Sequence, residues 1–161
     1  MRIIIDADAC PRGVKNICTE ISAQYQIPMT MVSDRSHDLS DDDAEVIFVD
    51  QGKDASDFKI VALTTPQDIV VTHDYGLASL VLDKAMSVIH PDGFIYSAAN
   101  IDELLYKRYL NQKLRQSGHA ARIKKRRPED DEAFRIILLS LVTPMDAVLT
   151  DRGLDNGGNS L

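Results

Sequence analysis

The stretch RIIIDADACPRG, residues 2–13, decides the fold of this chain. It opens with a β-branched apolar run, Ile3 to Ile5, which is typical of a short buried strand. Asp6 and Asp8 follow the run, and they would point to the same side if the strand continued that far. Pro11 suits the first turn of a helix, and the apolar residues after it recur at helical spacing. The stretch therefore predicts a strand, an acidic strand end and an amphipathic helix.

The alternation of strand and helix continues along the chain. Apolar runs predict strands over residues 29–32, 44–49, 69–72 and 87–90, and helical spacing predicts helices over 55–63, 75–85, 100–116 and 133–141. Asn100 and Glu103 have the spacing of a capping box that would open the long helix. Because the strands are unbroken apolar runs, they indicate a mainly parallel sheet covered on both faces. The predicted fold class is α/β.

Length and composition exclude several classes of protein. With 161 residues, 44% hydrophobic and 27% charged, the chain has the size of one domain and a globular composition. It shows no apolar run of membrane-spanning length, no recognisable cleavable signal and no disulfide framework, so we expect a cytoplasmic protein without a membrane partner. We predict a single domain over residues 1–149 and a flexible C-terminal tail over residues 150–161.

Aspartates follow three of the predicted strands. Asp6 and Asp8 come after the first strand, Asp54 and Asp57 open the helix after the third, and Asp74 follows the fourth. Residues just past parallel strands converge on one crevice, and carboxylates crowded there repel one another unless a cation is present. Oxygen ligands without His or Cys select Mg²⁺ or Mn²⁺.

We therefore expect the five aspartates to form a catalytic metal site. Asp6 and Asp74 would bind the ion directly, and Asp54 and Asp57 would act through bound waters, with one of them orienting the attacking water. For Asp8 or Asp74 taken alone, helix capping remains an alternative.

Positive charge is concentrated in one segment, residues 107–127. This segment holds nine of the 18 Lys and Arg residues and none of the 25 acids, although the net charge of the chain is −7. Because nucleic-acid binding depends on the local patch, we expect the segment to hold a polyanion by its phosphates. A solvated helix face and loop is the alternative. The nine residues are Lys107, Arg108, Lys113, Arg115, Arg122, Lys124, Lys125, Arg126 and Arg127.

Four motifs carry a resemblance to a known family. They are DADACP at residues 6–11, KDASDFKIV at 53–61, VVTHDYGLASLVL at 70–82 and NIDELLYKRYLNQKLRQSG at 100–118. Over residues 1–142 the chain resembles the YaiI/YqxD family of small bacterial proteins, which is grouped by resemblance with PIN-like nuclease domains. The resemblance implies a PIN-like three-layer α/β/α fold and an acidic metal site formed by the five aspartates. Where the family usually carries Gly-Pro-Lys after the long helix, this chain has HAARIKKRRPEDD, which keeps the positive charge.

These features favour a Mg²⁺- or Mn²⁺-dependent nuclease that hydrolyses phosphodiester bonds, in RNA rather than in DNA. One alternative is an aspartyl-phosphate phosphatase with Asp6 as nucleophile and Asp8 as acid, although the Thr or Ser expected after such an element is missing. Another is a non-catalytic module that binds nucleic acid or protein. The sequence is also compatible with a homo-oligomer.

Overall fold

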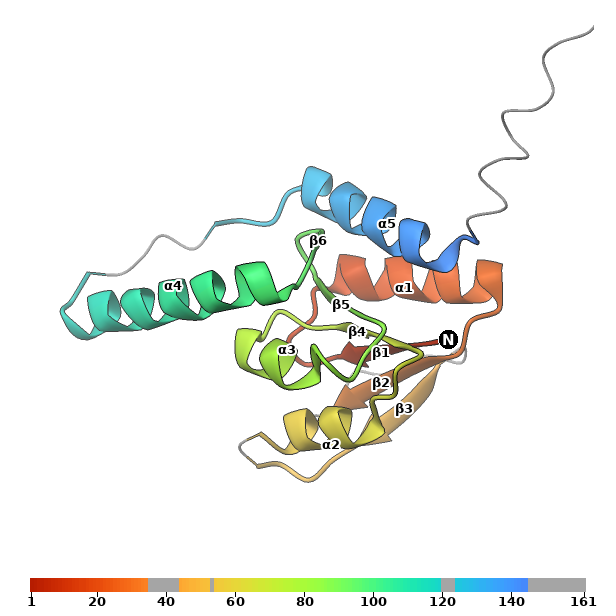
Figure 1. Ribbon diagram of the computed structural model, residues 1–161, viewed down its shortest axis with the longest axis horizontal. Coiled ribbons are helices and arrows are strands. Elements are labelled where there is room, and N and C mark those ends of the chain that lie inside the picture. Colours follow the sequence, from red (N-terminus) through yellow and green to blue (C-terminus); the bar gives the residue numbers. More distant parts are fainter. Residues whose placement is uncertain (35–43, 53, 120–123, 145–161) are drawn as a thin grey trace, which may run out of the picture.

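The described part of the chain contains six strands and five helices. The computed structural model describes residues 1–34, 44–52, 54–119 and 124–144 (Figure 1). The strands are β1 (Arg2–Asp6), β2 (Met29–Ser33), β3 (Glu45–Phe48), β4 (Asp68–Val71), β5 (Ser87–His90) and β6 (Phe94–Ile95). The helices are α1 (Arg12–Tyr25), α2 (Ala55–Leu63), α3 (Tyr75–Val81), α4 (Ala98–Gln116) and α5 (Pro128–Val142). The predicted tail, residues 150–161, lies outside the described residues, as does Arg122.

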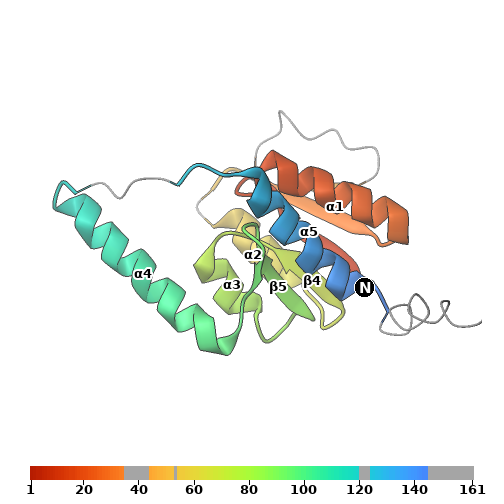
Figure 2. The same cartoon turned by 90° about the horizontal axis from the view of Figure 1, so that it is seen from above.

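The strands form one sheet in the order β3-β2-β1-β4-β5-β6. Neighbouring strands are parallel except β6, which pairs antiparallel with β5. Helices α1 and α5 pack together on one face of the sheet, and α2 and α3 cover the other face (Figures 1 and 2). The predicted α/β fold, with a mainly parallel sheet between two helical layers, is confirmed.

The central strand β1 is buried on both faces, which explains its unbroken apolar run. Ile3 and Ile5 belong to the core shared with α1 and α5, whereas Ile4 belongs to the core shared with α2 and α3. All three side chains are fully buried, and burial of each contributes roughly 1.5–3 kcal/mol to stability. Asp6 therefore lies at the end of a strand that is paired on both sides and buried on both faces.

The structure corrects the predicted start of the long helix. Helix α4 begins at Ala98, because the Ser97 hydroxyl accepts a hydrogen bond from the Asn100 backbone and the Asn100 side chain accepts one from the Ser97 backbone. Asn100 is thus the third residue of the helix, and the capping box predicted for Asn100 and Glu103 is wrong.

Two other helix boundaries differ, and one strand was not predicted. Helix α5 begins at Pro128 instead of residue 133, with three acids in its first turn that favour the positive end of the helix dipole. Helix α3 ends at Val81 instead of residue 85. Strand β6 has only two residues, which is too short for a recognisable apolar run or alternation in the sequence.

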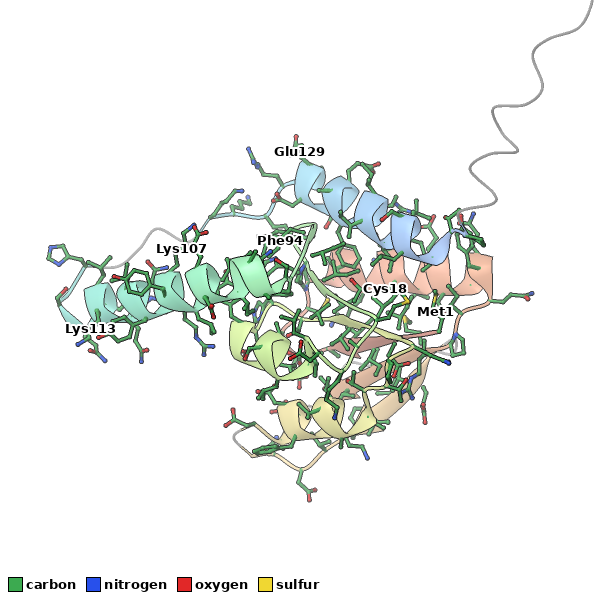
Figure 3. All side chains as sticks on the ribbon, in the orientation of Figure 1. Met1, Cys18, Phe94, Lys107, Lys113 and Glu129 are labelled. Atoms are coloured by element: carbon green, nitrogen blue, oxygen red, sulfur yellow. The ribbon has the colours of Figure 1, made fainter. Side chains whose placement is uncertain are left out.

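The outer part of α4, residues 106–116, projects from the rest of the protein, and we call it the arm (Figures 1 and 2). Ile101 on the first turns of α4 is buried, whereas every residue of the arm is exposed. Figure 3 shows the side chains of Lys107 and Lys113 extending from it. Among the described helices, none combines the length and apolarity needed to cross a membrane.

Candidate metal and nucleic-acid site

The candidate site lies where the strand order reverses. The chain runs outward from β1 to β2 and β3 and then returns to place β4 on the other side of β1. In parallel sheets, ligands bind in the crevice beyond the carboxyl ends of the strands at such a reversal. Asp6 ends β1, and Thr72 follows β4 directly. The Thr72 hydroxyl donates to Asp6 Oδ2 at 3.0 Å and accepts from the backbone N–H of Asp74 at 3.0 Å, so it joins the two strand ends.

Asp6 is a buried carboxyl group with a raised pKa. Only 5% of the residue is exposed, and this burial raises its pKa to about 6. The hydrogen bond from Thr72 lowers the pKa, whereas the charges of Asp57, Asp8 and Asp74 raise it. Asp6 is therefore within electrostatic reach of three other predicted site residues.

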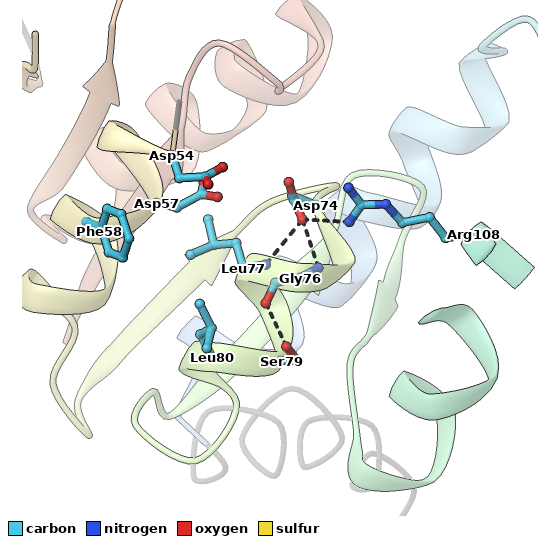
Figure 4. A pocket seen from close by; sticks show the side chains of 9 residues that line it. All are labelled: Asp54, Asp57, Phe58, Asp74, Gly76, Leu77, Ser79, Leu80 and Arg108. Carbon is cyan, nitrogen blue, oxygen red and sulfur yellow. Dashed lines mark hydrogen bonds and ion pairs between the residues drawn. The ribbon is translucent and has the colours of Figure 1, made fainter. Parts of the chain in front are cut away.

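Asp74 caps α3 and also contacts the arm. Its Oδ1 accepts hydrogen bonds from the backbone N–H groups of Gly76 at 2.8 Å and Leu77 at 3.2 Å. The capping role that the sequence left open for Asp74 is confirmed. The same oxygen lies 3.3 Å from Nη1 of Arg108 (Figure 4). One carboxylate thus connects the start of α3 with the arm.

Asp54 and Asp57 come from the start of α2. Asp54 adopts a left-handed backbone conformation, φ +64°, and makes no side-chain capping bond. Aspartate adopts this conformation more readily than most residues that have a side chain. Asp57 is half-buried, and this burial raises its pKa; the charges of Asp74 and Asp54 raise it further, and Arg108 lowers it.

An open pocket of about 410 Å³ brings three of the aspartates together. In Figure 4, Asp54 and Asp57 lie on one side of the pocket and Asp74 with Arg108 on the other. The nine lining residues are Asp54, Asp57, Phe58, Asp74, Gly76, Leu77, Ser79, Leu80 and Arg108. Asp6 and Asp8 do not line it, and Asp6 joins the group through electrostatic interaction and through Thr72.

Asp8 has a different setting. Strand β1 ends at Asp6. Asp8 is therefore outside the strand, and strand geometry does not put the two side chains on the same side. Asp8 Oδ1 accepts a hydrogen bond from Ser33 Oγ at 2.5 Å, and Oδ2 accepts one from the backbone N–H of Asp34 at 2.7 Å. Both oxygens act as acceptors, whereas the phosphatase alternative needs Asp8 to donate a proton. This geometry gives that alternative no support.

The chemistry of the candidate donors, carboxylate oxygens, is compatible with a magnesium or manganese ion that keeps most of its waters. Among the described residues, no three His, Cys, Asp or Glu side chains form a ready ligand set. Mg²⁺, however, is usually bound by only one or two carboxylates together with several waters. Asp6 and Asp74 each use one oxygen in the hydrogen bonds described above, so the other oxygen of each is the candidate ligand. Burial, and after it the charges of neighbouring aspartates, raises the pKa of Asp6 and Asp57, and a bound cation would favour the ionised form of both.

Arg108 connects the acidic pocket with the arm. A second open pocket of about 360 Å³ lies along α4, and Arg108 lines both pockets. The other residues of the second pocket are polar or aromatic: Tyr75, Asn111, Gln112 and Arg115. Two predicted nucleic-acid-binding residues, Arg108 and Arg115, therefore share one groove beside the carboxylates.

Within the described part of the chain, the contacts of the two lysines of the arm are exposed. Lys107 pairs with Glu103 at 3.2 Å, and the ammonium of Lys113 lies 5.4 Å from the centre of the Tyr109 ring. Exposed ion pairs contribute at most about 1 kcal/mol, so a phosphate can displace them.

Arg126 serves the fold, unlike the basic residues of the arm. Its guanidinium donates to Asp131 Oδ1 at 2.8 Å, to Asp92 Oδ1 at 3.0 Å and to the Pro91 carbonyl at 2.8 Å. These bonds attach the segment before α5 to the turn between β5 and β6. The exposed members of this segment are Lys124, Lys125 and Arg127.

Sequence reasoning missed two features of the site. Thr72 was predicted only as the last residue of a strand, although a hydroxyl two positions before a strand-end aspartate was the available signal. The apolar side of the pocket, formed by Phe58, Leu77 and Leu80, was also missed, because these residues have the spacing of ordinary helix packing.

Comparisons with known proteins agree with the resemblance seen in the motifs. Residues 4–144 match the family model described as "Uncharacterized BCR, YaiI/YqxD family". A UPF0178 protein of Ruminiclostridium cellulolyticum is 46% identical over 145 residues, which cover 89% of this chain and 94% of the relative. A UPF0178 protein of Natranaerobius thermophilus is 42% identical over 146 residues, which cover 90% of this chain and 98% of the relative. No solved structure matches the chain.

Proposed function

We propose that this chain, which belongs to the YaiI/YqxD family, is a Mg²⁺- or Mn²⁺-dependent nuclease with a PIN-like domain that acts on RNA in preference to DNA. The observation that carries the proposal is the group of mutually interacting aspartates at the reversal of strand order, in contact with a basic arm through Arg108. Acidic groups alone repel a polyanion, and a basic arm alone supports binding without chemistry. Their contact supports hydrolysis of a phosphate ester.

Each residue has a role that its position supports. Asp6 and Asp74 would hold the ion, and Thr72 keeps the two strand ends at a constant separation. Asp57, half-buried with a raised pKa, would accept a hydrogen bond from the attacking water and orient it. When bound, the ion would polarise the phosphoryl oxygen and favour formation of the nucleophile from water.

Arg108 would bind the phosphate next to the cleaved bond. Its guanidinium already lies at the boundary of the acidic pocket and the groove along α4, and guanidinium groups match phosphate geometry. The other basic residues of the arm would hold the strand by its backbone, without reading bases. Binding should therefore weaken as salt rises, because each neutralised phosphate releases counterions.

Cleavage of end-labelled single-stranded RNA and DNA, with Mg²⁺, with Mn²⁺ and with chelator, tests the proposal. Asp6→Asn and Asp74→Asn should each lower the metal-dependent rate by at least about 100-fold while circular dichroism stays unchanged. The matched control is Asp83→Asn, an exposed aspartate between α3 and β5, which should cleave at the wild-type rate. Equal rates for wild type and both site variants would refute the proposal.

Two outcomes would assign the alternative functions instead. Release of phosphate from p-nitrophenyl phosphate without RNA cleavage would indicate a phosphatase. Salt-sensitive RNA binding that both site variants retain, with no hydrolysis at any metal concentration, would indicate a non-catalytic binding module.

A further inference from the structure

The acidic pocket has an apolar side that metal binding does not explain. Phe58 on α2 is 70% exposed and Leu80 on α3 is 58% exposed, and both line the pocket with the carboxylates. Because the Phe58 ring is largely exposed, it buries little apolar surface, and core packing does not explain its presence at this position. A hydrated metal ion and a phosphate are bound through oxygen ligands and N–H donors, which these two side chains do not supply.

The ring lies at a defined place relative to the acids. Phe58 follows Asp57 directly, and its backbone N–H donates to the carbonyl of Asp54, the residue that precedes α2, at 3.0 Å. Figure 4 shows the ring on the α2 side of the pocket, with Asp54 and Asp57 next to it and Leu77 and Leu80 between it and the Asp74 side.

We propose that the Phe58 ring is a stacking platform for a nucleobase next to the phosphate held at the carboxylates, and that the substrate is therefore single-stranded. This inference rests on the proposed nuclease function and specifies its substrate. A nucleotide combines what the pocket offers, since it has an anionic group for a metal and Arg108 and a flat apolar face for a ring.

The restriction to single strands follows from the geometry of stacking. In a duplex both faces of an internal base are covered by its neighbours, so only an unpaired, unstacked base can lie on an aromatic ring. Leu80 would support the edge of the base, and because every base has a flat face the platform would accept all four.

Phe58→Trp tests the platform directly, because the natural chain contains no tryptophan and the indole becomes its only one. Its fluorescence is measured with adenosine 5′-monophosphate and with ribose 5-phosphate, which has the same phosphate and sugar but no base. We expect quenching by the nucleotide and none by ribose 5-phosphate. Equal quenching by both, or by neither, would overturn the inference without reference to activity.

Kinetics with single-stranded RNA and with a blunt duplex of the same sequence provide the second test. Phe58→Ala should raise KM for the single strand roughly 5- to 150-fold with kcat nearly unchanged, and Phe58→Trp should restore it. The control is Ile136→Ala, another exposed apolar residue, 58% exposed on α5, which should leave KM unchanged. Cleavage of the duplex as fast as of the single strand would contradict the inference.

The experiments separate the two proposals. If the wild type cleaves RNA but Phe58→Ala has the wild-type KM and the nucleotide does not quench, the platform fails and the nuclease stands. If the wild type cleaves nothing, the nuclease fails and the quenching experiment alone decides whether a base binds at Phe58. A changed sedimentation coefficient for Phe58→Ala with unchanged KM would assign the ring to a protein contact and overturn the platform.

Discussion

Replacing Asp6 with asparagine should make the metal-free protein more stable at neutral pH. The pKa of Asp6 lies at about 6 in the folded chain, against 3.8 for an ordinary aspartate, because the carboxyl group is buried among other acids. At about 1.4 kcal/mol per pKa unit, holding this group ionised costs the folded state roughly 3 kcal/mol. Asparagine removes the charge, and its carbonyl can still accept the hydrogen bond from Thr72.

The expected increase is therefore up to about 3 kcal/mol, which corresponds to a rise in Tm of roughly 6–12 °C for a domain of this size. The sign depends on pH. A raised pKa in the folded state gives stability that is fully present below pH about 3.8 and is lost as pH rises through about 6. Wild type should lose this stability between those values, and Asp6→Asn should not.

Urea denaturation followed by circular dichroism, in chelator and from pH about 4 to 8, measures both effects. Asp68→Asn is the matched control, because Asp68 is also buried but pairs with Arg2 at 2.9 Å and accepts two bonds from Thr65. Burial would raise the pKa of Asp68, but these bonds outweigh it and lower the pKa, so this variant should be less stable than wild type at neutral pH. If Asp6→Asn is no more stable than wild type at pH about 8, the electrostatic account of the site is refuted.

Three further substitutions test other parts of the structure. Asp74→Ala should lower the free energy of unfolding in urea by about 1 kcal/mol through loss of the α3 cap, whereas Asp74→Asn, a good capping residue, should not. Gly93→Ala should cost more than about 1 kcal/mol and lower Tm, because Gly93 has φ +88° and an added Cβ would lie 2.5 Å from the Ala133 backbone. Arg126→Ala should cost roughly 1.5–3 kcal/mol, measured in the same way, by leaving Asp131 without its guanidinium partner; an unchanged midpoint would show that this anchor contributes nothing.

The sheet could be predicted from the sequence because its central strands are buried on both faces. The unbroken apolar run Ile3 to Ile5 is typical of a strand buried on both faces, and the strands before and after α3 show the same kind of run. Helix ends were harder, since they depend on which polar residue captures the free backbone groups. Ser97 does so one turn earlier than the sequence indicated, and β6 exists only because the turn at Gly93 returns the chain to β5.

The convergence of Asp6, Asp57 and Asp74 was also predictable, since parallel strands end at one edge. The positions of the basic residues were not. Arg108 contacts Asp74, whereas Arg126 contacts Asp131 of the fold. These contacts depend on the direction in which α4 leaves the sheet, and long-range packing determines that direction. The apolar side of the pocket beside the aspartates could not be predicted for a similar reason. The sequence around Phe58 does not distinguish an exposed ring from a buried one.

The arm has a length as well as a charge. Residues 106–116 at 1.5 Å each extend about 16 Å along the helix axis. Successive phosphates of one strand rise about 3.4 Å along the axis of B-form DNA and are farther apart in an extended single strand, so the arm would contact at most about five of them. The length of the arm would then decide which products stay bound. Long chains would remain attached between successive cuts, and fragments of a few nucleotides would dissociate.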